Sequence, residues 1–251
     1  MMTKDQIVLL SRKHKINESV IYREYLQLFF LNVLYSFNQS KKVFFKGGTA
    51  IHLIYKAPRF SEDLDFTVEL QEDIFLSLLK DIFQRMSSQE HVDFKKRKTI
   101  AGKRFLLTAY PSVLPYKTFI NLDFSFREKV LQPQKSIIQT DYPVIFTSYL
   151  YHLSKEEIFA EKIRALLTRR KGRDIYDLWY LSTRGVVINS DLVQAKAKYY
   201  KLENITKEKI VERISQFSEK DFILDLTPFI PLHERTRLPH FFAYIKNYLK
   251  T

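Results

Sequence analysis

The sequence predicts an α+β protein in which a mixed α/β half, residues 1–150, precedes an α-helical half, residues 151–251. Strand-like runs alternate with helical patterns as far as about residue 150, whereas nearly every segment after Ser154 has helical periodicity. Of the 251 residues, 45% are hydrophobic, which is enough to bury a substantial core. The chain has no cysteine, so disulfide-based folds and thiolate metal sites are excluded.

Local patterns define the elements at the start of the first half. Apolar residues recur at helical spacing between residues 17 and 37, which predicts one or two amphipathic helices. A short strand then runs into the Gly47–Gly48 turn, and a short helix follows that ends before Pro58, because a residue preceding proline disfavours the α region. An alternating strand over residues 61–70 and a helix over residues 72–86 come next.

Three strand-like runs complete the first half and predict an antiparallel meander beside the earlier strands. They cover residues 91–99, 103–113 and 117–128. The first two are joined across Ile100-Ala101-Gly102 in the manner of a hairpin. The helices expected in the second half cover residues 154–172, 173–185, 189–200, 206–218 and 239–250.

The charge balance favours a polyanionic partner. Lys plus Arg number 41 against 28 Asp plus Glu, which gives a formal net charge of +13 and indicates nucleic acid as a partner class. A generally basic surface without such a partner is the alternative. The longest apolar segment is interrupted by Gln27 and Asn32 and is too short to span a membrane, and no signal peptide pattern opens the chain. A cytoplasmic protein without a membrane segment is therefore expected.

Three aspartates in strand-like runs suggest a metal site. Alternate side chains of a strand share a face, so Asp63 and Asp65 are expected to point the same way. Asp123 lies between two apolar residues of a later run and joins them if its strand is a neighbour. Clustered carboxylates favour Mg²⁺ or Mn²⁺, and such clusters serve phosphoryl and nucleotidyl transfer. The alternative is that they line a solvated strand face, because aspartate is mostly exposed.

The paired glycines fit the same chemistry. Gly47 and Gly48 stand at a strand-to-helix turn, where free backbone N–H groups and the absence of side chains would let a triphosphate approach. Thr49 could add a hydroxyl donor. A Gly-Gly pair alone is more often only a turn.

Together these motifs resemble a known family. "GGTA", "RFSEDLDF" and "INLDFSF" are similar to the signature of the polymerase-β-like nucleotidyltransferase superfamily, and more narrowly to the AbiEii/AbiGii toxins of type IV toxin–antitoxin and abortive-infection systems. The resemblance extends from about Val43 to Leu181 and implies a nucleotidyltransferase core followed by a helical lobe. By position it implies nucleotide binding by Gly47, Gly48, Thr49 and Ser61, and metal binding by Asp63, Asp65 and Asp123. Arg59 also matches a family position, without a defined role.

Two residues of the helical half match later motifs of that family. Lys162 falls within the apolar arc of its predicted helix, where a lysine usually extends to the surface. Asp174, shortly after Gly172, would ordinarily be interpreted as a helix N-cap. The resemblance instead implies that both belong to the active site and that Lys162 contacts the nucleotide phosphates, with Arg173 and Asp177 as less defined neighbours.

A basic run marks the predicted hairpin. It is expected either to be a solvated face or, beside the acids, to bind a phosphate backbone. Its members are Lys95, Lys96, Arg97, Lys98, Lys103 and Arg104. The weaker cluster Arg169, Arg170 and Lys171 lies at a predicted helix C-terminus, where cations complement the helix dipole.

The predicted function is therefore metal-dependent transfer of a nucleoside monophosphate from an NTP to RNA. The resemblance implies the tRNA 3′ end as acceptor, growth arrest as the outcome and a separately encoded antitoxin as partner. Two alternatives are a housekeeping transferase acting on a protein or small-molecule hydroxyl, and a non-catalytic RNA-binding module. A degenerate module of that kind is expected to have lost at least one of the three acids, and all three are present.

Overall fold

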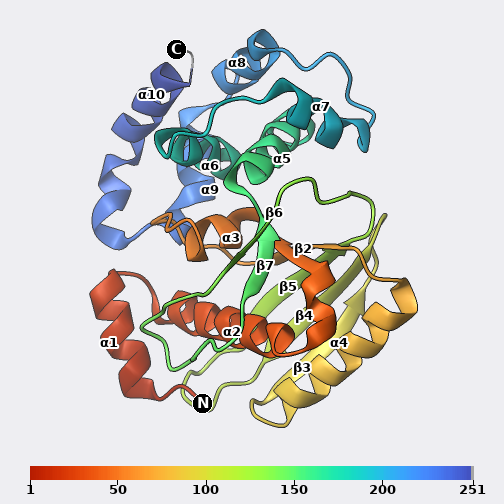
Figure 1. Cartoon of the computed structure of the whole chain (residues 1–251). Helices are drawn as coiled ribbons and strands as arrows, with labels where there is room; N and C mark the ends of the chain where they lie inside the picture. The colour runs from red at the N-terminus through yellow and green to blue at the C-terminus, as the bar shows by residue number, and fades with distance from the viewer. Residues whose placement is uncertain (250–251) are drawn as a thin grey trace. The chain divides into compact units, whose positions relative to one another are not determined.

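The computed structural model describes residues 1–249, and these divide into two compact units. Unit 1 comprises Met1–Lys56 and Phe60–Leu153. Unit 2 comprises the short segment Ala57–Arg59 and the chain from Ser154 onward. The predicted fold class, a mixed sheet with flanking helices followed by a helical region, is confirmed. Figure 1 shows the elements in chain order.

Among the described residues, seven strands form one mixed sheet in unit 1, in the order β3-β4-β5-β2-β1-β7-β6. The strands are β1 (Val43–Lys46), β2 (Leu64–Val68), β3 (Val92–Arg97), β4 (Lys103–Ala109), β5 (Thr118–Ser125), β6 (Pro133–Ser136) and β7 (Leu150–Leu153). Strand β2 pairs in parallel with β5, as β1 does with β7, and the other neighbours are antiparallel. The predicted meander β3-β4-β5 is confirmed, whereas β6 and β7 were not predicted.

Helices α2 and α4 cover one face of this sheet. The helices of unit 1 are α1 (Lys4–His14), α2 (Glu18–Tyr35), α3 (Gly47–Leu53) and α4 (Glu72–Ser87). Ring contacts join α2 to β2 through Phe30 and Phe66, and α4 to β5 through Phe75 and Phe124. The core of unit 1 therefore lies between these helices and the sheet.

The sequence predicted that helix α2 is amphipathic, and this prediction is wrong: the helix is buried on nearly all sides. Polar Gln27 is 1% exposed, and its amide donates to the carbonyl oxygens of Ser61 and Glu62 at 3.1 and 2.9 Å. These bonds remove the cost of burying the amide. Helix α2 thereby also fixes the segment that leads into β2.

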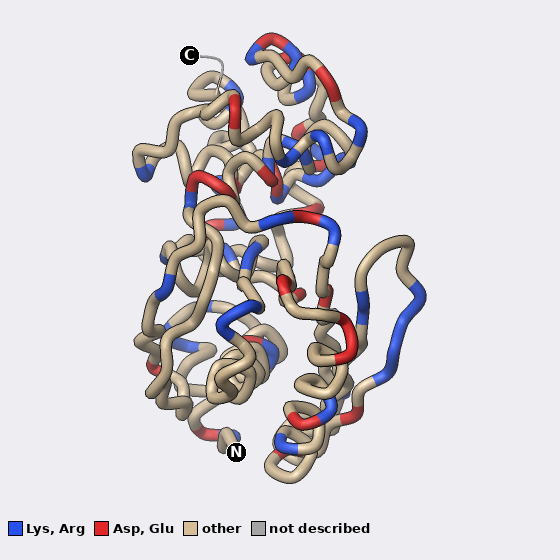
Figure 2. The backbone as a smooth tube through the Cα atoms, turned by 45° about the vertical axis from the view of Figure 1, so that its right-hand side comes forward, with Lys and Arg blue, Asp and Glu red and all other residues tan. Residues whose placement is uncertain are grey.

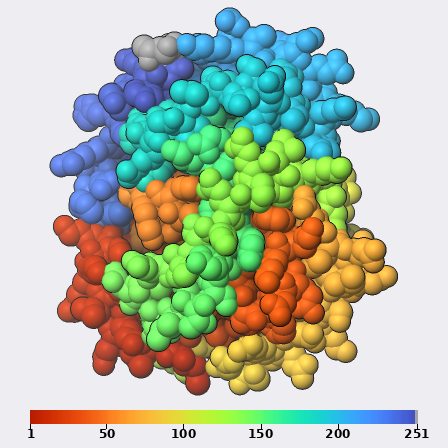
Figure 3. Space-filling view, in the orientation of Figure 1, coloured from red at the N-terminus to blue at the C-terminus, as the bar shows by residue number. Residues whose placement is uncertain are grey.

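The long connection before β7 lies on the surface of unit 1. Figure 3 shows residues 137–149, in green, lying across this face beside the red N-terminal helix. Lys13 of α1 pairs with Asp141 at 2.6 Å, although both side chains are more than half exposed. The connection thus follows α1 before the chain enters β7.

In its described part after Ser154, unit 2 consists of helices and the connections between them. Its helices are α5 (Lys155–Thr168), α6 (Gly172–Thr183), α7 (Ser190–Lys198), α8 (Lys207–Ser215), α9 (Glu219–Leu226) and α10 (Leu238–Tyr248). The predicted capping residue is confirmed, because the Ser154 hydroxyl accepts from the backbone N–H of Glu157 at 3.0 Å. Helix α9 was not predicted separately, and Lys250, the last residue of the predicted final helix, lies outside the described residues. Across residues 1–249, none of the helices combines the length and the apolar character that crossing a bilayer requires.

Candidate active site

A row of five charged residues crosses the sheet of unit 1. Arg97 on β3 pairs with Arg104 on β4, Arg104 with Asp123 on β5, Asp123 with Asp65 on β2, and Asp65 with Lys46 on β1. Residues paired in register lie on the same face of a sheet. We call these five residues the charged row. It places Asp65 and Asp123 side by side. Strand β5 is therefore the neighbour of β2 that the sequence analysis required for the acids to converge.

The face opposite the charged row is the core face. Leu64, Phe66, Leu122 and Phe124 alternate with the two acids and are at most 2% exposed. Phe66 and Phe124 stack with their ring centroids 5.0 Å apart. Because apolar burial fixes the pairing register of β2 against β5, it also fixes the two carboxylates on the other face.

Asp63 joins this group from outside the strand. It precedes β2, which begins at Leu64, and its Oδ1 accepts from the Asn121 side-chain amide at 2.9 Å. The Thr49 hydroxyl donates to the backbone carbonyl of Asp63. Thr49 is fully buried, so in this structure it supports the Asp63 segment, in contrast to the nucleotide-facing hydroxyl that the sequence suggested.

The glycine turn lies directly against Asp65. Gly47 has φ +79°, and a Cβ at this position would lie 2.2 Å from Asp65 Oδ2. Both the left-handed backbone and the close approach require glycine there. Gly48 follows as the second residue of α3, so the turn brings side-chain-free backbone to the aspartates. Ser61 is partly exposed, in the segment that Gln27 holds.

The donor set suits a hard divalent cation. Asp63, Asp65 and Asp123 offer only carboxylate oxygens, the ligands preferred by Mg²⁺ and Mn²⁺. Within residues 1–249, no three His, Asp or Glu side chains are already arranged as a metal site. Two of the oxygens that a cation would use accept hydrogen bonds instead, from Asn121 and from Arg104. The three acids fit the cation by chemistry and position, and their side chains must turn to enclose it.

Arg104, which the sequence assigned to the basic run, also lies beside the acids. Its Nε donates to Asp123 Oδ1 at 2.5 Å, which makes it part of the acid cluster. Burial raises the pKa of Asp123, the hydrogen bond and charge of Arg104 oppose this, and nearby Asp63 raises it further. The hydrogen bond to Asp123 in turn raises the pKa of Arg104. The alternating patterns of "KRFLLTA" and "FINLDFS" are compatible with placing Arg104 beside Asp123, but only the pairing register of β4 and β5 shows it.

The strand register divides the predicted basic run between the two faces of the hairpin. Figure 2 shows Lys and Arg along both arms, joined by an uncharged turn. Arg97 and Arg104 lie on the face of the acids, and alternation places Lys95 there too. Lys96 is paired with Phe105, which faces α4 through Phe83.

The remaining two members of the run lie away from the acids or beyond the strand. Lys103 is paired with Phe124 on the core face, and its ammonium pairs with Glu72 of α4 at 2.5 Å. Lys98 follows the end of β3 and is exposed. The basic run is therefore not one uniform surface.

The burial of Lys46 was not predicted. Lys46, at the β1 end of the charged row and directly before Gly47, pairs with Glu128 at 2.8 Å. Lys46 is 7% exposed and Glu128 3%. This pair could not be predicted from local patterns, because Glu128 lies in the loop after β5, far from Lys46 in the chain.

Lys162 and Asp174 form an ionic network within unit 2. Lys162 is 7% exposed, and its ammonium contacts Asp174 at 3.0 Å and Asp177 at 2.7 Å. It therefore does not extend to the surface. Asp174 is not an N-cap, because α6 has its N-cap at Lys171. Arg169 completes the partners of Asp174, with Nε and Nη2 at 2.8 and 2.9 Å from its two oxygens.

Arg59 belongs to the same network. Its guanidinium donates to both oxygens of Asp177, at 2.8 and 2.7 Å, and the Arg59 side chain is 2% exposed. This bidentate pair explains why Ala57–Arg59 is part of unit 2. Arg173, another suggested neighbour, instead pairs with Asp225 at 3.6 Å.

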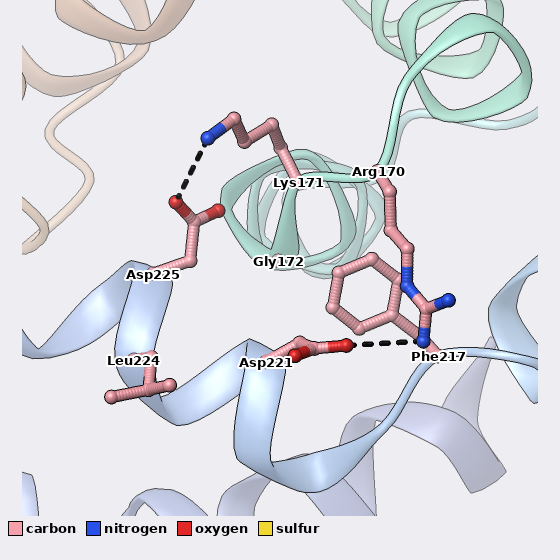
Figure 4. Close-up of a pocket in the computed structure, with 7 residues that line it drawn as sticks. All are labelled: Arg170, Lys171, Gly172, Phe217, Asp221, Leu224 and Asp225. Carbon is pink, nitrogen blue, oxygen red and sulfur yellow. Dashed lines mark ion pairs between the residues drawn. The ribbon is translucent and has the colours of Figure 1, made fainter.

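The basic cluster after α5 is also paired with acids. Figure 4 shows Arg170 directed toward Asp221 and Lys171 toward Asp225, at 3.0 and 3.8 Å, around a pocket of about 440 Å³. Arg170 also lies over the Phe217 ring. Each cation of this pocket thus faces a carboxylate of α9, which gives an anion little advantage there.

Comparison with known proteins identifies the family. The family described as "Nucleotidyl transferase AbiEii toxin, Type IV TA system" matches residues 30–247. A comparison with curated protein sequences finds no match. MenT4, a nucleotidyltransferase toxin from Mycobacterium tuberculosis H37Rv, is 19% identical with a TM-score of 0.66, and the match covers 100% of this chain and 94% of that one.

A second solved structure has the same fold. JHP933 from Helicobacter pylori is 17% identical with a TM-score of 0.56, and the match covers 94% of this chain and 93% of that one. At these identities the two structures support the fold, and the family match over residues 30–247 supports the assignment. The chain belongs to the AbiEii nucleotidyltransferase toxin family of type IV toxin–antitoxin systems.

Proposed function

We propose that this nucleotidyltransferase toxin transfers a nucleoside monophosphate from an NTP to a hydroxyl of RNA, the 3′ end of a tRNA, and thereby arrests growth. The observation that carries the proposal is the in-register pairing of Asp65 with Asp123 beside the Gly47 turn. Acids on neighbouring strands next to a side-chain-free turn bring metal ligands and a phosphate-accepting backbone together.

Each group has a part in that reaction. Asp63, Asp65 and Asp123 would hold Mg²⁺ or Mn²⁺, whose chemistry in such transfers is to activate the attacking oxygen and neutralise the leaving phosphates. The Gly47–Gly48 turn would admit the triphosphate, because it brings backbone without side chains close to Asp65. The RNA hydroxyl oxygen forms a bond to the α-phosphorus, the bond to the bridging oxygen breaks, and pyrophosphate leaves while the hydroxyl proton passes to solvent.

The basic hairpin supports RNA as the acceptor class. Lys95 and Arg97 are exposed on the face that carries the acids, and the chain has a formal net charge of +13. Lysine and arginine that displace counterions from phosphates provide sequence-independent affinity. Membership of a type IV toxin–antitoxin family suggests a cognate antitoxin as a further partner.

The test is transfer of label from each NTP to total tRNA with Mg²⁺ or Mn²⁺. Asp65→Asn is expected to lower the rate at least about a hundredfold, because metal-assisted charge stabilisation contributes several kcal/mol. Asp73→Asn, at an exposed acid in the first turn of α4, is the matched control and should retain activity. Absence of labelled RNA with every nucleotide and cation, or equal labelling by Asp65→Asn, would contradict the mechanism. Labelling of a protein or small alcohol in place of RNA would overturn the acceptor.

A further inference from the structure

Arg104 occupies a carboxylate oxygen that the proposed cation needs. Its Nε lies 2.5 Å from Asp123 Oδ1, and the two residues are paired in register on adjacent strands. The Arg104 side chain is 45% exposed, so it is held at Asp123 without being enclosed. A side chain with these properties can leave Asp123 without disturbing the core of unit 1.

A cation and the Arg104 guanidinium compete for the same carboxylate. Both are positive, so a divalent cation held by Asp63, Asp65 and Asp123 would displace Arg104 by occupying Oδ1 and by repulsion. Arg104 already binds Asp123, and Asp65 is paired in register with Asp123 on the next strand. Its release is therefore an expected consequence of filling the acid cluster.

The order of the strands indicates where a released Arg104 would act. The glycine turn follows β1, whereas Arg104 and Arg97 lie on β4 and β3, on the other side of Asp65 and Asp123. In an in-line transfer the acceptor approaches opposite the leaving group. A triphosphate at the glycine turn thus places the acceptor on the side of Arg104.

Arg97 provides a second positive charge on that side. It is exposed and paired in register with Arg104, so two arginines lie within about 10 Å of Asp123 at ordinary strand spacing. Guanidinium groups bind phosphate oxygens bidentately, which suits the terminal phosphodiesters of an RNA strand.

We propose that Arg104 couples cation binding to acceptor binding. Without a divalent cation it pairs with Asp123, and with one bound it donates to a terminal phosphate of the acceptor RNA beside Arg97. This inference rests on the proposed function, because it assumes that the acids bind the cation and that RNA is the acceptor. By thermodynamic linkage, the cation must then raise RNA affinity by the same factor by which RNA raises cation affinity.

The experiment measures two equilibria without NTP. One is binding of a labelled single-stranded RNA oligonucleotide by fluorescence anisotropy, in EDTA and in Mn²⁺; the other is binding of Mn²⁺ alone by calorimetry. In the unaltered protein, Mn²⁺ is expected to raise RNA affinity at least about fivefold. Arg104→Ala should abolish this increase and bind Mn²⁺ more tightly, because nothing then competes for Asp123. Lys96→Ala, which removes a charge from the opposite face of the hairpin, should retain the increase.

A second variant guards against a folding defect in Arg104→Ala. Asp123→Ala removes both the charge and the accepting oxygen and so releases Arg104 without a cation. RNA affinity in EDTA should then rise, and the rise should disappear in the double variant Asp123→Ala/Arg104→Ala. A rise of the same size in the double variant would overturn the proposal, because it would reflect only the lost negative charge.

The other outcomes separate this inference from the proposed function. If Arg104→Ala weakens RNA binding equally with and without Mn²⁺, Arg104 is a permanent phosphate contact and the coupling is refuted. If it weakens Mn²⁺ binding, Arg104 supports the acid cluster structurally, and the inference is again refuted. An unaltered protein that transfers label to RNA while failing these tests leaves the proposed function standing. A protein that binds no RNA contradicts the proposed acceptor itself.

Discussion

Replacing Asp177 by asparagine tests whether the buried network of unit 2 holds its charges together. Asp177 is fully buried, accepts hydrogen bonds from Nε and Nη2 of Arg59, and forms an ion pair with Lys162. Asparagine keeps the shape but removes the negative charge. Lys162 and Arg169 then keep Asp174, whereas Arg59 loses the carboxylate that it binds.

The expected loss in free energy of unfolding is large because these groups are shielded from water. Arg59 is 2% exposed and loses its bidentate partner, while Lys162 keeps Asp174 at 3.0 Å. Removing one partner of a buried ion pair costs about 3–5 kcal/mol, because the other charge stays buried. With a urea m-value of about 1–3 kcal/mol/M, the unfolding midpoint should fall by at least about 1 M.

Fluorescence of Trp179 is a direct assay for this loss. Trp179 is the only tryptophan, lies on α6 two residues after Asp177, and therefore reports on unit 2. Asp221→Asn is the matched control, since the Arg170–Asp221 pair is about half exposed and should contribute less than about 1 kcal/mol. If Asp177→Asn shifts the midpoint no more than Asp221→Asn does, the network does not stabilise unit 2 as argued.

Two further predictions concern Asp174 and Gly47. Burial alone would raise the pKa of Asp174, but Lys162 and Arg169 hold it well below its ordinary value. The ionised Asp174 therefore stabilises the folded state fully above about pH 4, and this contribution to the free energy of unfolding is lost as pH falls towards the folded-state pKa. Urea unfolding between pH 5 and pH 2.5 should show an acid loss that Asp174→Asn reduces, and an identical slope in both proteins would contradict this. Gly47→Ala, with φ +79° and its Cβ against Asp65, should cost about 1–2 kcal/mol in unfolding and also lower transfer to RNA. Gly185 has φ +80°, and a Cβ added there would meet no atom within 4 Å, so Gly185→Ala should lower stability without lowering transfer to RNA. Equal transfer by both variants would refute a role in the reaction for the close approach of Gly47 to Asp65.

Local patterns were sufficient for the elements with strong periodicity. The strands that carry Asp65 and Asp123 alternate clearly, and their adjacency followed once a meander was expected beside β2. Strand β6 could not be predicted, because Pro133–Ser136 is short, exposed and polar, and exists only by pairing with β7. The pairing partner, not the segment itself, determines such an edge strand.

Long-range ionic partners were beyond the sequence. Lys162 and Asp174 were singled out by resemblance, but nothing local indicated that Arg59, over a hundred residues earlier, binds Asp177 beside them. The burial of Gln27 in α2 depends likewise on two carbonyl groups more than thirty residues away. The nucleotide-binding role of Lys162 and the active-site role of Asp174 stay predictions, since the structure shows them paired within unit 2.

Two like charges are paired within the charged row, which lowers the stability of the sheet at the candidate site. Asp65 and Asp123 lie directly opposite on parallel strands, where like charges destabilise a sheet, and burial raises the pKa of Asp123 further. A sheet selected for stability alone would place apolar or oppositely charged pairs there. Arg104 compensates Asp123 from the next strand, but its side chain is too exposed to be a buried structural partner. The proposed cation would relieve the repulsion between the two acids, and the register that brings Arg104 beside them would make it the residue most sensitive to that cation.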